Sequence, residues 1–171
     1  NNPSWFKGEN LPVEMVSWED CQTFIKKLNR LLSKELGGKR FALPTEAQWE
    51  FAARGGNKSK GYKYAGSNNF DDVAWYFWNS SDKPHPVAQK CPNELGLYDM
   101  SGNVWEWCQD WYDENYYLTS QKYNPKGPAD GKGRVIRGGD FCFDAMACRV
   151  SCRYGIMPEG SDFYPGLRLC L

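Results

Sequence analysis

The order of the periodic segments constrains the fold of this chain most. Helical patterns occur only near its start, and short strand-like pieces follow. The first helix is predicted to begin after Ser17, where Asp20 completes a capping box, and to end at Gly37 and Gly38. One side of this helix is apolar at helical spacing, with Trp18, Cys21, Phe24, Ile25, Leu28, Leu31 and Leu32. Two helices followed by many short strands predict the α+β class.

The second helix is predicted to begin after Thr45, with Gln48 in the capping-box position, and to end at Gly55 and Gly56. The polar, Gly-rich residues 55–72 then form a long surface loop. No repeat or linker divides the chain, so we predict a single domain over residues 1–171. It should hold two helices, small antiparallel sheets and long loops. The strand-like pieces are residues 73–79, 96–100, 103–112, 134–139 and 166–171.

The charge balance argues against whole classes of partner. The formal net charge is +0, so no global field attracts nucleic acid or an anionic membrane, and we expect no nucleic-acid partner. No apolar run approaches the roughly 20 residues that span a bilayer, so we expect no membrane insertion by this chain. Aromatic residues make up 16% of the chain, and such side chains dominate binding surfaces as well as cores.

The cysteines and the histidine give little support for catalysis or zinc. The chain has 7 cysteines but no Cys-x-x-Cys pair, and His85 is its 1 histidine. A zinc site built from Cys and His pairs is therefore disfavoured, while one or two disulfides stay open. His85 lies between two prolines, which predicts a surface-loop residue, and no catalytic triad can be assembled around it.

A series of segments in a fixed order carries a family resemblance. The segments are residues 12–29, 41–56, 93–112, 134–139 and 166–169, with Pro-Thr-Glu-Ala-Gln-Trp-Glu and Gly-Asn-Val-Trp-Glu-Trp the most specific pieces. Together they resemble the sulfatase-modifying-factor family, whose best-known member is the formylglycine-generating enzyme. The resemblance covers nearly the whole chain. It implies a variant of the C-type lectin fold, in agreement with the α+β class.

The enzyme of this family implies a first alternative function. It holds copper(I) between two cysteines separated by four residues, soon after the Arg-Gly-Gly segment. Here Cys142 and Cys148 lie in that region, but five residues separate them, and residues 139–149 look shorter than in the enzyme. We therefore expect no catalytic residue and no thiol oxidase activity. A copper-dependent formylglycine-generating-type oxidase remains the alternative.

The C-terminal segment, residues 134–171, carries a second resemblance. It is similar to the variable segment of proteins that diversity-generating retroelements mutate, many of which have this type of C-type lectin fold. Their invariant frame matches residues 134–139, 148–153, Pro158 and 166–169. The frame is expected to hold the scaffold, with Gly138 and Gly139 allowing a tight backbone path and Arg149 and Arg153 pinning loops.

The resemblance implies that the irregular residues between the frame pieces vary and bind ligand. Mutagenesis at template adenines turns an Asn codon into Asp, Cys, Phe, Ala, Tyr, Gly or Ile, which describes much of this set. Met146, Met157 and Glu159 need another template codon or are fixed. The predicted ligand-binding positions are Asp140, Cys142, Phe143, Asp144, Met146, Cys152, Tyr154, Gly155, Ile156, Met157, Gly160, Asp162, Phe163 and Tyr164.

These positions predict a recognition protein rather than an enzyme. Large aromatic side chains supply rigid contact area and the aspartates supply polar selectivity, so a macromolecular ligand, a protein, is expected. The resemblance implies a place at the bacterial cell surface or outside the cell, with a lipid anchor on a segment absent from this chain as one route. Cys142 and Cys152 are expected as exposed free thiols. The ligand's identity and the oligomeric state stay open.

A structural calcium is also implied by the resemblance, although no cofactor is required. The family's enzyme holds calcium around a segment that matches residues 99–106. This gives Asp99 and Glu106 as side-chain ligands, with backbone oxygens of Gly102 and Val104. The alternative is that Asp99 caps a turn and Glu106 pairs with an arginine. A calcium-dependent lectin is the second alternative function, but the sugar-binding tripeptides Glu-Pro-Asn and Gln-Pro-Asp do not occur.

Overall fold

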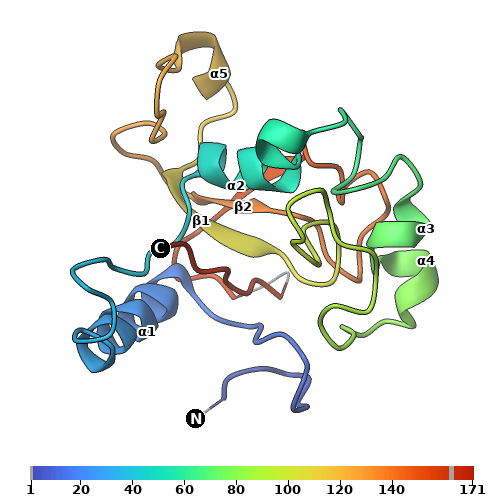
Figure 1. Cartoon of the computed structure of the whole chain (residues 1–171), viewed down its shortest axis with the longest axis horizontal. Helices are drawn as coiled ribbons and strands as arrows, with labels where there is room; N and C mark the ends of the chain where they lie inside the picture. The colour runs from blue at the N-terminus through green and yellow to red at the C-terminus, as the bar shows by residue number, and fades with distance from the viewer. Residues whose placement is uncertain (1, 162–163) are drawn as a thin grey trace.

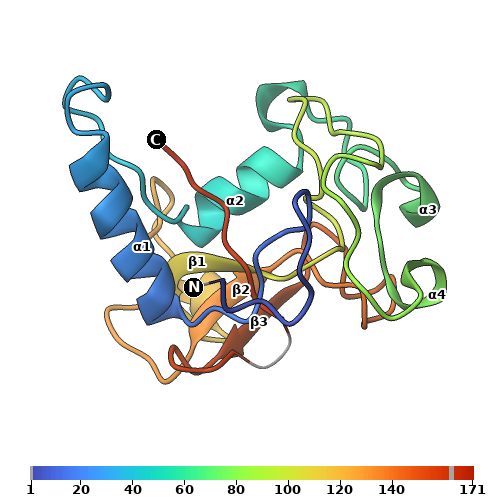
Figure 2. The ribbon, with the colours of Figure 1, turned by 90° about the horizontal axis from the view of Figure 1, so that it is seen from below.

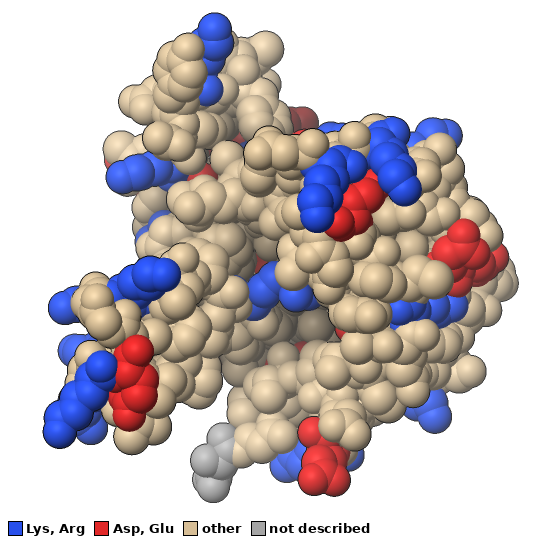
Figure 3. Space-filling model, in the orientation of Figure 1, with Lys and Arg blue, Asp and Glu red and all other residues tan. Residues whose placement is uncertain are grey.

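The computed structural model describes residues 2–161 and 164–171 and has the predicted α+β architecture (Figure 1). A small three-stranded sheet lies at the centre. The first long helix lies at the lower left of the sheet and the second above it, while short helices and long connecting segments lie to its right (Figure 1). On the face in Figure 3, basic and acidic side chains form small groups of both signs with uncharged surface between them.

Helix α1, Trp18–Leu31, begins as predicted. The Ser17 hydroxyl accepts from the backbone N–H of Asp20 at 3.0 Å, and the Asp20 carboxylate accepts from the backbone N–H of Ser17 at 3.2 Å. The helix ends at Leu31, earlier than the sequence suggested, because Gly37 and Gly38 belong to the turn that follows. Its apolar side is only partly buried: Cys21 and Ile25 enter the core, whereas Phe24 and Leu31 stay exposed.

Helix α2, Glu46–Ala53, is also capped as predicted. The Thr45 hydroxyl accepts from the Gln48 N–H, and the Gln48 side chain accepts from the Thr45 N–H. Gly55, at φ +89°, takes the left-handed conformation that ends the helix. The predicted loop after it is ordered, and it contains a 3₁₀ turn, η1 (Gly56–Lys58), and the start of α3.

The sheet has the order β1-β2-β3 and is antiparallel throughout. Strands β1 (Glu106–Trp111) and β2 (Arg134–Arg137) lie within predicted pieces, but β3 (Arg153–Ile156) lies in the segment that looked irregular. Trp105 and Trp107 are core residues. Glu106, which lies between them, and Cys108 are buried as well, so β1 begins with both of its faces covered.

Three predicted strand pieces are wrong. Residues 73–79 end α3 (Phe70–Val73) and form most of α4 (Phe77–Ser80), because Asn69 and Asn79 side chains accept from backbone N–H groups and favour turns there. Residues 96–100 form turns, and residues 166–171 make only the single bridges of Gly166 and Cys170. The remaining short helix is α5 (Tyr116–Thr119).

The N-terminal segment and the C-terminal residues run side by side beneath the sheet (Figure 2). The Val16 N–H donates to the Pro165 carbonyl at 3.3 Å, and the Trp18 N–H donates to the Pro158 carbonyl at 2.8 Å. Ala42 and Cys170 form a further bridge, so the C-terminal segment is tied to the start of α1 and to the chain that leads into α2. Within the described residues, no helix has the length and apolar character needed to cross a membrane.

Candidate ligand-binding surface

Arg137 is the centre of the frame that holds the C-terminal segment. Its side chain is fully buried, and its guanidinium ion-pairs with Glu46 and Glu50 of α2. The same guanidinium donates to the backbone carbonyls of Val150 and Cys152. It therefore joins β2, α2 and the chain entering β3 at one point. The sequence did not single out Arg137 for this role.

Two further arginines of the C-terminal segment make the same kind of contact. Arg153 binds Glu46 through two parallel hydrogen bonds of 2.7 and 2.6 Å, so the prediction that it pins a loop is confirmed. Arg168 binds Glu106 in the same bidentate way, at 2.6 to 3.0 Å. Arg149, the other predicted pin, makes only a local bond to the Met146 carbonyl. Arg137, Arg153 and Arg168, which we call the frame arginines, thus fasten the C-terminal segment to glutamates of the preceding part of the chain.

The two glycines of the frame allow the tight backbone path that was predicted. Gly138 and Gly139 have φ of +100° and +74°, where side chains other than glycine are strained. A Cβ on Gly139 would lie 2.9 Å from the carbonyl carbon of Ala147. The chain therefore leaves β2 and folds back closely on the loop that carries the predicted variable positions.

Six of the predicted binding residues are exposed, and we refer to them as the outer set. They come from two places in the fold, the loop after β2 and the strand β3 with its following turn. The outer set consists of Cys142, Phe143, Asp144, Met146, Tyr154 and Met157.

The buried Trp105 lies beneath both parts of the outer set. Its indole meets the Phe143 ring edge-on with 5.9 Å between centroids, and the Tyr154 ring at 6.4 Å. Only 2% of Trp105 is exposed. Trp105 thus packs beneath both Phe143 and Tyr154, which are distant from it and from each other in sequence. The structure brings these two residues onto one surface.

The remaining predicted binding residues are less accessible. Asp140 is fully buried, so the expectation that it faces outward is wrong: its Oδ1 accepts from the backbone N–H groups of Cys142 and Phe143 and closes the turn. Residues 162 and 163, predicted as Asp162 and Phe163 of the binding set, lie outside the described residues. Five others are half-buried, namely Cys152, Gly155, Ile156, Gly160 and Tyr164.

The half-buried residues pack on the scaffold. Ile156 and Cys152 contact the core cluster that contains Trp105, which leaves the Cys152 thiol less exposed than expected. A Cβ on Gly155 would come within 2.3 Å of the Tyr112 side chain. Tyr164 packs on the ring of Phe141 at 4.9 Å. Substitutions at these half-buried positions are therefore more restricted by packing than substitutions in the outer set.

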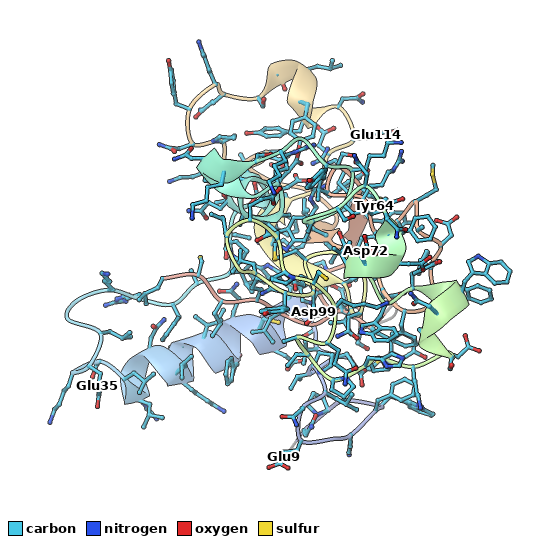
Figure 4. The ribbon with its side chains drawn as sticks, turned by 45° about the vertical axis from the view of Figure 1, so that its right-hand side comes forward. Glu9, Glu35, Tyr64, Asp72, Asp99 and Glu114 are labelled. Atoms are coloured by element: carbon cyan, nitrogen blue, oxygen red, sulfur yellow. The ribbon has the colours of Figure 1, made fainter. Side chains whose placement is uncertain are left out.

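The predicted calcium ligands have other partners. The Glu106 carboxylate accepts from Arg168 and, at 2.7 Å, from the Trp49 indole. Asp99, near the centre of the view in Figure 4, accepts from the Ala88 N–H, and burial raises its pKa. This is the pairing that the sequence left open as the alternative to calcium. The described residues bring together no three His, Cys, Asp or Glu side chains that could hold a metal ion.

The donor set therefore fits calcium poorly. Asp99, Glu106 and Val104 line one cavity, but Arg168 lines it too, and its positive charge already neutralises Glu106. Calcium would have to compete with a buried bidentate ion pair for the same carboxylate oxygens.

The two cysteines in the position of the copper site differ in environment. Cys142 is exposed, whereas Cys148 is fully buried near Tyr64 and Tyr76. Burial, with a smaller contribution from the Asp140 charge, raises the pKa of Cys142 to about 11 and that of Cys148 well above its usual value. Without a metal both thiols are therefore protonated at neutral pH. All seven cysteines are free, so the disulfides left open by the sequence are not formed.

Alkylation should separate the cysteines by accessibility. In the folded protein, iodoacetamide should label the exposed Cys91 and Cys142, while Cys21, Cys108 and Cys148 react only after unfolding. Mass spectrometry of digests gives the site and the rate. A copper(I) titration complements the alkylation experiment. We expect the wild type and Cys142→Ser to bind copper(I) equally. Stoichiometric copper that is lost in both Cys142→Ser and Cys148→Ser would establish the oxidase alternative instead.

His85 lies in a loop, as the sequence predicted, but it is half-buried rather than on the surface. Its ring stacks on Trp75 at 3.7 Å with 10° between the planes, and its Nε2 lies 2.8 Å from the Ser80 carbonyl. The backbone of His85 is held by the Asn103 side chain. The histidine is part of the scaffold that connects α4 to the 99–106 loop.

Comparisons with known proteins agree with this geometry. The model of the Sulfatase-modifying factor enzyme 1-like domain matches residues 2–171. The chain belongs to this family. It is 37% identical to the formylglycine-generating enzyme of Streptomyces coelicolor over 175 residues, which cover 93% of this chain and 52% of that protein. It is 35% identical to the chaperone protein LppX of Paenibacillus barcinonensis over 196 residues, or 88% of this chain and 66% of that one.

Among solved structures, Treponema denticola variable protein 1 superimposes with a TM-score of 0.85 at 33% identity, covering 99% of this chain and 77% of that chain. The match confirms the resemblance to retroelement variable proteins with the C-type lectin fold of the formylglycine-generating type. This chain spans about half to two thirds of the length of the curated relatives described above.

Proposed function

We propose that this chain is a ligand-binding protein that catalyses no reaction. A retroelement diversifies residues 134–171, and the outer set contacts a macromolecular ligand, a protein. The observation that carries this proposal is the separation of roles within one segment. The frame arginines are bound to glutamates elsewhere in the chain, while the outer set is exposed beside them.

The frame is compatible with diversification because its hydrogen bonds to the variable segment are made to backbone carbonyls and not to variable side chains. Arg137 binds the carbonyls of Val150 and Cys152, so a change of side chain at residue 152 leaves that hydrogen bond in place. The bidentate bonds of Arg153 and Arg168 also use no side chain of the outer set. Substitution in the outer set therefore alters the surface without removing what holds it.

The chemistry of the outer set favours a protein ligand over a metabolite. Phe143, Tyr154 and the two methionines offer apolar contact area on an exposed surface, and Asp144 adds polar selectivity. Small ligands instead bind in concave pockets that enclose most of their surface. Lack of catalysis is supported by the different environments of Cys142, which is exposed, and Cys148, which is fully buried. Display at a bacterial cell surface or secretion is part of the same proposal.

Sequencing the DNA that flanks the gene tests the diversification directly. We expect a near-copy of the codons for residues 134–171, with a reverse-transcriptase gene beside it. The copy should differ from the gene only where the copy has adenine, and the differing codons should include most of the outer set. Absence of both the copy and the reverse transcriptase would refute diversification.

A randomised library tests whether the surface tolerates variation. With the six outer-set codons randomised, most clones should remain folded, because exposed substitutions usually change stability little. A matched library randomised only at Gly155 should lose most folded clones, since even a Cβ there meets the Tyr112 side chain. Protease resistance of displayed clones measures the folded fraction. Equal losses in the two libraries would contradict the assignment of the outer set.

A further inference from the structure

An exposed aromatic pair lies beside the outer set but outside residues 134–171. Phe77 and Trp78 of α4 are 46% and 78% exposed, and their rings pack edge-to-face at 5.0 Å. Large aromatic side chains on a soluble protein's surface mark contact sites when they adjoin other apolar side chains. Phe143 of the outer set supplies such a neighbour, because its loop is bound to α4.

Backbone contacts hold α4 against the variable loop. The Phe77 N–H donates to the Phe143 carbonyl at 2.9 Å, and the Ser80 hydroxyl donates to the Phe141 carbonyl at 2.8 Å. Both acceptors are main-chain oxygens, so substitutions of the loop side chains leave these bonds intact. The aromatic pair therefore keeps its place beside the outer set whichever residues the loop carries.

Side chains of the scaffold also fix α4 in advance of binding. The Asn79 side chain accepts from the Tyr76 N–H at 2.9 Å and donates to the Ala74 carbonyl at 3.0 Å. The Tyr76 hydroxyl donates to Asp71 at 3.0 Å, and Tyr76 itself is buried. A preorganised contact residue loses little conformational freedom on binding, which increases its contribution to affinity.

We propose that Phe77 and Trp78 form a constant apolar anchor of the binding surface. The partner is a folded protein that places an apolar side chain against the Trp78 indole. The outer set contacts the partner's residues around that side chain. This inference rests on the proposed function, because continuity with the outer set is what assigns the pair to the ligand. Since the pair lies outside residues 134–171, diversification leaves it unchanged, and it supplies affinity that each new variant inherits.

Selection against a model protein tests the anchor. The outer-set library is displayed on the full chain and selected for binding to lysozyme. In the resulting binders, Trp78→Ala should weaken lysozyme binding at least about tenfold, and Trp78→Phe should retain most of the affinity. Tyr123→Ala is the matched control, because Tyr123 is 76% exposed in a different part of the chain and should leave the affinity unchanged.

The outcomes separate this inference from the proposed function. Binders that tolerate Trp78→Ala as well as Tyr123→Ala would overturn the anchor and leave the outer set as the binding surface. A folded library that yields no lysozyme binders would overturn the proposed function and the anchor with it. Circular dichroism and melting temperature check that Trp78→Ala is folded, which its exposure leads us to expect.

Discussion

Replacing Arg137 by methionine is expected to destabilise the domain by about 3–5 kcal/mol, a large part of the stability of a domain of this size. The substitution leaves Glu46 and Glu50 without their shared buried cation. It also removes the donors for the Val150 and Cys152 carbonyls. Urea denaturation followed by tryptophan fluorescence measures the free energy of unfolding.

Arg149→Met is the matched control for this experiment. Arg149 lies in the same segment, but it is half-exposed and bonds only to the nearby Met146 carbonyl. We expect it to cost at most about 1 kcal/mol. If the two variants lose similar stability, Arg137 does not have the central role in the frame that its contacts indicate.

Replacing Asp140 by asparagine is expected to stabilise the protein at pH 8. Burial raises the pKa of Asp140 from 3.8 to about 7, so the folded protein carries a costly buried charge above that pH. Its Oδ2 has no hydrogen-bond partner within the described part of the chain, whereas Oδ1 accepts from two backbone N–H groups. Asparagine keeps the acceptor and removes the charge. The difference between the ordinary pKa of 3.8 and the folded-state pKa of about 7 corresponds to a gain in unfolding free energy of up to about 4 kcal/mol.

The pH dependence follows from the sign of this shift. Between about pH 4 and pH 7 the folded state holds a proton on Asp140 that the unfolded state has released. Asp140 therefore makes the wild type lose stability as the pH rises through this window, and the loss is complete above the folded-state pKa. The difference in unfolding free energy between Asp140→Asn and the wild type should grow across the same window.

Asp144→Asn provides the comparison within the same loop. The exposed Asp144 also accepts from backbone N–H groups, those of Met146 and Ala147, but it lies at the surface. We expect the unfolding free energy of this variant to follow that of the wild type closely from pH 4 to 8, because Asp140 is still present. An Asp140→Asn protein whose stability parallels that of the wild type at every pH would show that burial does not raise the pKa of Asp140.

Much of the scaffold could be predicted from the sequence because its signals are local. The capping boxes at Ser17 and Thr45 act within three residues, and both start their helices as predicted. The strand-like pieces at residues 103–112 and 134–139 predicted β1 and β2, and the Arg-Gly-Gly segment predicted the tight path of the glycines after β2. The motif order gave the family, and the irregular residues around the frame located the outer set.

Other features depend on contacts between distant residues. The pairing of Arg168 with Glu106 spans 62 residues and that of Arg153 with Glu46 spans 107, so no short pattern encodes them. The burial of Asp140 and the placement of Trp105 beneath two loops likewise arise only when the loops meet. The strand β3 forms because β2 offers it a partner, although its own residues carry no strand signal.

The sequence by itself thus determined where the helices begin, which family the chain belongs to and which segment departs from the frame. Each of these is encoded by short sequence patterns such as capping boxes and motifs. The tertiary structure decided which of the irregular residues face outward, which of them are buried, and that Phe77 and Trp78 join them. The physical reason is that exposure is a property of packing: a side chain is on the surface only if no distant part of the chain covers it.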